Sequence, residues 1–206
     1  MFVVTADQRG SRKGTDLIPA ALATVTQNGS RPLALSPERT AGDEFQVAVS
    51  DARAALGIVL DLTRTRTWSV GVGVGAVESP LPTSVRAARG EAFVNARDAV
   101  DRAKKATTRL AVTARDDAGG DAEALVRLLV ELRDRRSDEG WEVYDLLADG
   151  LTQREAATRL GISEGAVSLR AKSAALRAEE AAVPALERAL ERLDAAEVVR
   201  PSVGPD

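Results

Sequence analysis

Cysteine and histidine are both absent from this chain of 206 residues. Without cysteine the protein can form no disulfide framework and offers no thiol nucleophile. Without histidine it lacks the commonest general base and a frequent metal ligand, so a catalytic or metal site must use carboxylates, lysine, arginine or hydroxyl groups. Aromatic residues make up only 3% of a chain that is 44% hydrophobic. We therefore expect a core built from alanine, valine and leucine.

Long apolar runs are also missing. No run reaches the roughly 18 residues that a membrane-spanning helix needs. The first residues, Met1–Asp7, are short and have no basic lead, so they do not have the pattern of a signal peptide. The sequence therefore predicts a cytoplasmic protein with no membrane partner.

Residues 152–172 have the pattern of two helices joined by a tight turn. Thr152 can cap the first helix, and Glu155 three residues later completes a capping box. Gly161 suits a turn conformation that a β-carbon would oppose, and Ser163 can cap the second helix. The small Ala157 lets the two helices approach closely, and the residues expected to face inward are Leu160, Ile162 and Val167. This spacing predicts a helix-turn-helix.

The second helix of this pair would expose short polar and cationic groups, which suit a DNA major groove. The predicted DNA-binding residues are Arg154, Ser163, Glu164, Ser168, Arg170 and Lys172. An ordinary helical hairpin is the alternative. The stretch is similar to the C-terminal DNA-reading helices of sigma factors and LuxR-type regulators. That resemblance implies a backbone contact for Arg170 and places Ala171 where such sequences often have leucine.

Charge is distributed unevenly around this motif. The chain has a net charge of −3, which argues against a generally nucleic-acid-binding surface. Residues 151–177 nevertheless hold five basic and two acidic residues, a net +3, whereas residues 178–206 hold three basic and seven acidic residues, a net −4. The positive charge therefore coincides with the predicted DNA-binding motif.

The N-terminal half alternates strand and helix patterns in the order β α β β α β α β. Expected strands are Phe2–Ala6, Leu33–Ser36, Phe45–Ser50, Trp68–Val74 and Leu110–Thr113, and expected helices are Asp16–Gln27, Ala52–Thr63 and Val85–Ala106, the last one open to interruption at Gly90. This order predicts a split βαβ-type sheet with helices on one face, an α+β domain over residues 1–116. The glycines of Trp68–Val74 predict a close backbone approach.

Residues 117–121 are expected to be a linker, and residues 122–206 a helical DNA-binding domain. Its expected helices are Ala122–Arg136, Glu139–Ala148, the two helices of the helix-turn-helix, and Pro184–Glu197, which Pro184 would start. Leu186, Leu190 and Leu193 form an apolar stripe on the last helix. That stripe serves either packing within the domain or a homodimer interface.

Two acidic residues of the first domain are candidate metal ligands. Asp7 ends the first strand, and Asp43 lies at the tip of the central hairpin. In a split βαβ sheet these positions neighbour each other, so their carboxylates could hold Mg²⁺ or Mn²⁺ with a nucleotide. The alternative for each is a turn cap.

The hairpin sequence Ala41–Phe45 (AGDEF) resembles the signature of GGDEF nucleotide cyclases, and residues 68–75 are similar to the strand that follows in them. The whole domain looks most like the SatD family, through residues 10–13 (GSRK), 42–46 (GDEFQ) and 88–93 (ARGEAF). These resemblances imply a palm-like fold and nucleotide-binding roles for Asn95 and Lys104. They also place Ala99 where such cyclases often carry an arginine that stabilises phosphate charge.

Three functions follow from these patterns. The first is a DNA-binding transcription regulator, a homodimer on double-stranded DNA, whose palm-like domain binds a nucleotide or metal effector. The second is a nucleotidyl cyclase or transferase with a DNA-binding appendage. The third is an interaction module in which the palm-like domain only dimerises. The helix-turn-helix favours the first and third functions, and the missing arginine argues against the second.

Overall fold

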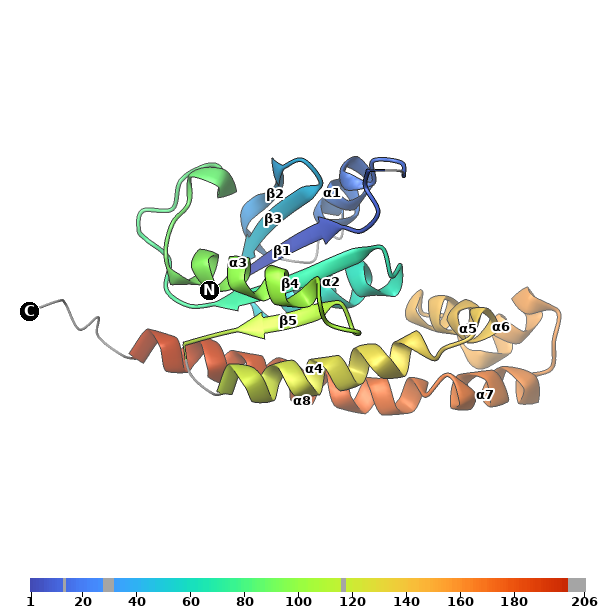
Figure 1. Ribbon diagram of the computed structural model, residues 1–206. Helices are drawn as coiled ribbons and strands as arrows, with labels where there is room; N and C mark the ends of the chain where they lie inside the picture. The colour runs from blue at the N-terminus through green and yellow to red at the C-terminus, as the bar shows by residue number, and fades with distance from the viewer. Residues whose placement is uncertain (13, 28–31, 116–117, 200–206) are drawn as a thin grey trace, which may run out of the picture. The chain divides into compact units, whose positions relative to one another are not determined.

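The structure of the protein is a computed structural model that describes residues 1–12, 14–27, 32–115 and 118–199 (Figure 1). The chain divides into two compact units. We call Met1–Arg127 with Leu186–Asp206 the sheet unit, and Leu128–Ala185 the helical unit. The boundary differs from the expected one at residues 117–121, because it falls within helix α4 (Ala118–Asp134) and helix α8 (Leu176–Val199).

A five-stranded mixed sheet organises the sheet unit, with strand order β2-β3-β1-β4-β5. The strands are β1 (Phe2–Gln8), β2 (Leu33–Ala41), β3 (Glu44–Val49), β4 (Trp68–Val74) and β5 (Leu110–Thr113). β1 pairs antiparallel with β3 and β4, β2 pairs antiparallel with β3, and β5 joins β4 in parallel. The chain is thus a mixed α+β protein, as the alternating sequence pattern predicted.

Large apolar side chains cover one face of this sheet. Side chains alternate between the two faces along each strand. Those that the central strands place on this face are all at most 3% exposed: Phe2, Val4, Phe45, Val47, Val70 and Val72. Helix α2 (Ala52–Arg64), which Asp51 caps through the Ala54 amide, packs against the central strands. Gln8 on this face binds the Thr15 carbonyl and the Leu17 amide, which lead into helix α1 (Ile18–Gln27).

Helix α3 (Glu91–Ala103) covers the other face, and Figure 1 shows it on the near side of the sheet. The expectation of helices on one face was therefore wrong. The reason is the pair Gly71 and Gly73: a β-carbon on Gly71 would lie 2.2 Å from the Val100 nitrogen, and one on Gly73 would lie 2.1 Å from the Ala92 oxygen. Helix α3 packs on the sheet at these two glycines, where the sequence predicted a close backbone approach. The buried residues of α3 are alanines and one valine.

The single helix predicted over residues 85–106 is interrupted in the structure. Residues 85–106 divide into a 3₁₀ turn, η1 (Val85–Ala87), and α3, with Gly90 between them at φ 129°. That conformation is hard for any residue with a β-carbon, so the sequence breaks the helix there. The first turn of α3 is then held to the chain just after β4, since the Ala92 amide donates to the Ala76 carbonyl at 3.2 Å.

Helix α4 protects the outer strand β5. Glu123 accepts a hydrogen bond from the Val112 amide at 2.8 Å, and Arg127 donates to the Leu110 carbonyl at 2.9 Å. These side chains occupy backbone groups that an open sheet edge would leave free for another chain. Residues 118–121, expected as linker, belong to this helix, while residues 116–117 lie outside the described chain.

Helix α8 starts eight residues before Pro184, so the expectation that Pro184 begins the last helix was wrong. Glu179 anchors the segment before the proline, at 5% exposure, and the leucine stripe holds the segment after it. Leu186, Leu190 and Leu193 are between 3% and 6% exposed within the sheet unit. The stripe therefore serves packing. None of the described helices is both long and apolar enough to cross a membrane.

Candidate nucleic-acid interface and polar pocket

The helical unit contains the expected helix-turn-helix, formed by α6 (Gln153–Leu160) and α7 (Glu164–Ser173) after α5 (Asp138–Ala148). The capping box at α6 is complete. The Glu155 amide donates to Thr152 Oγ1 at 3.2 Å, and the Thr152 amide donates to the Glu155 carboxylate at 2.8 Å. These backbone and side-chain hydrogen bonds from Thr152 lower the pKa of Glu155 below its usual range.

The turn between α6 and α7 has the conformation that its sequence predicted. Gly161 adopts a left-handed conformation with φ 66° and ψ 32°. The Ile162 amide reaches back to the Ala157 carbonyl at 3.1 Å, which satisfies a helix-end acceptor. Ser163 then caps α7 by accepting from the Ala166 amide at 3.1 Å.

A small core locks the crossing of the three helices. Its buried residues are Val143, Ala156, Ala157 and Val167, and Leu146, Leu147, Leu160, Ile162, Ala171 and Leu176 pack against them. All three residues predicted to face inward belong to this cluster, and so does the small Ala157. Ala171 contributes to this core as a small residue.

The outer surface of α7 holds most of the predicted DNA-binding residues. Arg154, Ser163, Glu164, Ser168 and Lys172 are all exposed. Arg170 differs, because its side chain is 31% exposed and donates to the Glu142 carboxylate of α5 at 3.3 Å. Lys172 makes no ion pair with any residue the structure describes. The helix therefore presents one free cation and one partnered cation.

A buried charge cluster, which sequence reasoning missed, supports the motif from behind. Glu179 of α8 accepts from Arg133 and, at 2.5 Å, from Arg136. The Arg136 guanidinium lies 4.3 Å from the ring centre of Trp141 in α5. These ion pairs span 46 and 43 residues, so no local pattern could have revealed them.

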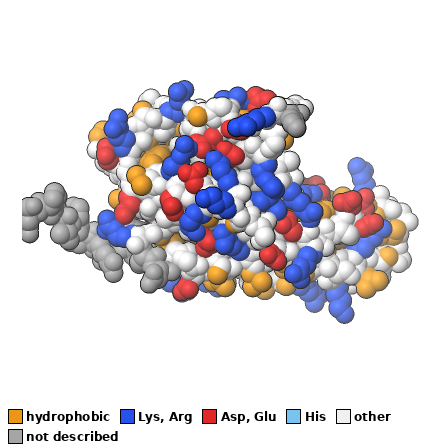
Figure 2. Space-filling model, in the orientation of Figure 1, with side chains coloured by type: hydrophobic (Ala, Val, Ile, Leu, Met, Phe, Trp, Pro, Cys, Tyr) orange, Lys and Arg blue, Asp and Glu red, His pale blue; other side chains and the backbone are white. Residues whose placement is uncertain are grey.

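A second charged cluster lies on the α3 face of the sheet unit. Asp7 and Glu44 are register partners on β1 and β3. Lys104 Nζ lies 3.0 Å from Asp7, and Arg97 donates to Glu44 at 2.7 Å. Partial burial disfavours the charged lysine, but the hydrogen bond to Asp7 and the charges of Asp7 and Asp101 prevail and raise the pKa of Lys104. Figure 2 shows basic and acidic side chains interspersed on this face.

Asp43 is separated from Asp7, contrary to the expectation that both line one pocket. Because Glu44 pairs with Asp7, and side chains alternate along a strand, Asp43 lies with Gln8 on the opposite face. Its carboxylate accepts from Ser11, and its backbone carbonyl accepts from the Gln8 amide. Within the described residues, no group of three or more acidic side chains could hold a metal ion.

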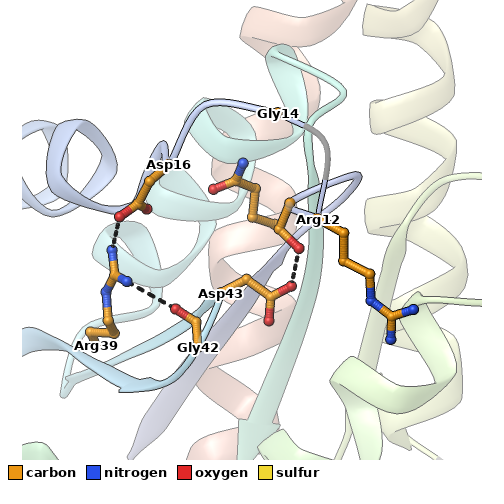
Figure 3. A pocket seen from close by; sticks show the side chains of 8 residues that line it. Arg12, Gly14, Asp16, Arg39, Gly42 and Asp43 are labelled. Atoms are coloured by element: carbon orange, nitrogen blue, oxygen red, sulfur yellow. Dashed lines mark hydrogen bonds and ion pairs between the residues drawn. The ribbon is translucent and has the colours of Figure 1, made fainter.

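Asp43 lines a pocket of about 390 Å³ between the loop after β1 and the β2–β3 hairpin (Figure 3). Arg39 reaches across the pocket and donates hydrogen bonds to Asp16 and to the Gly42 carbonyl. The pKa of Asp16 is lowered, first by the hydrogen bond from Arg39 and then by the one from the Ile18 amide. Arg12 extends away from Asp43 at the rim. Lys13 of the loop at residues 10–13 lies outside the described residues.

Asn95 and Lys104, the two predicted nucleotide-binding residues, do not meet. Asn95 donates to the Val74 carbonyl at 2.7 Å, and Lys104 follows the opposite end of α3. Nine residues of helix separate their backbones by about 13 Å. Asn95 therefore fastens α3 to β4, and Lys104 neutralises Asp7.

Comparisons with known proteins add no relative: no family model, no curated protein and no solved structure matches the chain.

Proposed function

We propose that the protein is a transcription regulator that binds double-stranded DNA with α7 in the major groove. The observation that carries this proposal is the α6–turn–α7 unit itself. Two side-chain caps, a left-handed Gly161 and a closed core hold the two helices, while the outer surface of α7 stays polar and solvent-exposed.

Charge supports the same proposal. Residues 151–177 carry a net +3 in a chain of net −3, so the local field around α7 attracts phosphate although the whole protein does not. Lys172 and Arg154 are exposed and reach solvent from this segment. We assign Ser168 and Glu164 to base contacts, because hydroxyl and carboxylate groups can read base edges.

The test is selection of duplexes from a random library by the full chain, followed by fluorescence anisotropy at several salt concentrations. We expect an enriched sequence and an affinity that falls steeply as salt rises. Lack of any binding at low salt would end the proposal. A variant with Lys172→Glu serves as the matched negative control, because it reverses an exposed charge without touching the core.

We also propose that the protein binds DNA as a homodimer. One helix of this kind reads only a few base pairs, and paired half-sites lengthen the sequence read. The leucine stripe of α8 is buried and cannot supply the interface. Leu125 and Leu128 on α4 are 49% and 68% exposed and offer an apolar surface for a second copy. Light scattering that shows a monomer at tens of micromolar would contradict the dimer.

For the sheet unit we propose a palm-like domain of SatD type that senses a nucleotide effector, with Mg²⁺ or Mn²⁺ as a companion ion. The interleaved order of β1 to β4 supports the palm-like assignment. The pocket beside Asp43 supports effector binding, because it combines an acid that can accept from a base or sugar with Arg12, which can meet phosphate. Turnover finds less support, since α3 covers Asp7 and Glu44 and basic residues pair with both.

A thermal-shift series tests this effector proposal. ATP or GTP with Mg²⁺ should raise the melting temperature, because a ligand that binds only the folded state stabilises it. Asp43→Asn and Arg12→Ala should each abolish the shift, whereas Asp7→Asn should keep it. No shift with any nucleotide would leave an inert dimerisation domain. A cyclic or dinucleotide product with Mn²⁺ that disappears in Asp43→Asn would favour the enzyme instead.

A further inference from the structure

A leucine stands exposed on the polar surface of α7. Leu169 is 65% exposed, although it lies two residues from the fully buried Val167. Its neighbours on the outer surface are Ser168 and Lys172. An exposed leucine on a helix otherwise covered by polar groups gains nothing from folding, since its apolar area stays in water. The core of the helical unit therefore does not explain this residue.

A glycine stands next to Leu169 on the same helix face. Gly165 precedes it by one helical turn, and residues four apart share a helix face. A β-carbon at Gly165 would meet only Ser163 Oγ, at 3.8 Å. No packing inside the unit requires a glycine there. The missing side chain leaves Leu169 as the raised apolar group on a surface that another molecule can approach closely.

We infer that Leu169 is a specificity-determining residue that contacts the C5-methyl group of a thymine in the major groove. This inference rests on the proposed function and deepens it. The thymine methyl is the apolar feature of the major groove, and contact with a leucine removes both apolar groups from water. Ser168 and Glu164 supply polar recognition beside it, so the inference assigns the apolar part of the readout to one side chain.

Replacement of thymine by deoxyuridine tests the inference, because deoxyuridine lacks only that methyl group. The duplex is the sequence that the full chain selects from a random library, with each thymine replaced in turn. For the wild-type chain we expect at least one position where deoxyuridine weakens binding about fourfold, which corresponds to one buried methyl group. Leu169→Ala should bind the thymine and deoxyuridine duplexes equally.

Val94→Ala is the matched control, because Val94 is 70% exposed on α3 and lies outside the helical unit. It should keep the full difference between thymine and deoxyuridine. Circular dichroism should show both variants folded, since neither side chain is buried.

Three results would overturn the inference. Selective binding by the wild-type chain with no sensitivity to deoxyuridine would overturn it and leave the proposed function standing. A Leu169→Ala chain that still distinguishes the two duplexes would assign the leucine elsewhere. Absence of DNA binding by the wild-type chain would overturn the proposed function as well.

Discussion

The sheet unit and the helical unit use charged side chains differently. On the α3 face of the sheet unit, two acids of the sheet pair with basic residues of α3 and its C-terminal end: Asp7 with Lys104, and Glu44 with Arg97. In the helical unit the pairs of Glu179 with Arg133 and Arg136 are buried behind the motif, while Lys172 remains in solvent on α7. Asp7 and Glu44 are thus paired with basic side chains inside the sheet unit, whereas Lys172 of α7 has no ion-pair partner among the residues that the structure describes.

Removal of the buried acid should have the largest effect and should be confined to the helical unit. Glu179→Ala leaves Arg133 and Arg136, whose side chains are 4% and 0% exposed, without their carboxylate. Loss of one partner of a buried pair costs about 3–5 kcal/mol. Urea unfolding followed by Trp141 fluorescence, in a Trp68→Phe background, measures the loss.

The control for Glu179 is Glu131→Ala. Glu131 pairs at 3.6 Å with Arg135, whose side chain is 81% exposed, and such surface pairs contribute about 0–1 kcal/mol. Equal losses of unfolding free energy in the two variants would show that the buried cluster does not support the helical unit.

The close contact between α3 and the glycines of β4 gives the next largest effect on stability, which we expect to be confined to the sheet unit. Gly73→Ala places a β-carbon 2.1 Å from the Ala92 oxygen and 2.2 Å from the Ala96 nitrogen. Such overpacking against backbone should lower the free energy of unfolding by about 3 kcal/mol. Gly120→Ala in α4, where nothing lies within 4 Å, should instead raise it by about 0.5–1 kcal/mol. Similar effects of both substitutions on denaturant unfolding would contradict the close approach.

Two cations of α7 sharpen the contrast between free and paired charge. Lys172→Ala should weaken DNA binding by roughly 1 kcal/mol and reduce the salt slope by about one, without a change in stability. Arg170→Ala should weaken binding similarly and also lower stability slightly, because it removes the pair with Glu142. Anisotropy titrations over a range of salt, with parallel melting curves, separate the two. A melting temperature that falls only in Lys172→Ala would reverse these roles.

The smallest effect concerns the α6 capping box. Hydrogen bonds from Thr152 lower the pKa of Glu155 in the folded chain. Its stabilising contribution is therefore present above the unfolded pKa of about 4.3 and is lost as pH falls through the lower folded value. The stability difference between wild type and Glu155→Gln should shrink as pH falls below that range. A difference that stays constant from pH 7 to 3 would contradict the charged capping box.

Local signals were sufficient for the helix-turn-helix. The residues Thr152, Glu155, Gly161 and Ser163 act on backbone groups within four residues of themselves, so their roles follow from spacing alone. The alternation of strands and helices likewise predicted the α+β class, because hydrophobic periodicity is a local property. The DNA partner, the effector and the dimer remain predictions.

Only the tertiary structure decided which side chains meet. Every residue of β1 except Asp7 is buried, so its sequence does not show which face Asp7 shares; the register with Glu44 decides that, and it separates Asp7 from Asp43. Gly71 and Gly73 indicated close approach, but the partner helix and its face emerge from packing. The pairs of Glu179 with Arg133 and Arg136 join segments more than 40 residues apart. Contacts of that range depend on how the elements pack together, which spacing along the chain does not encode.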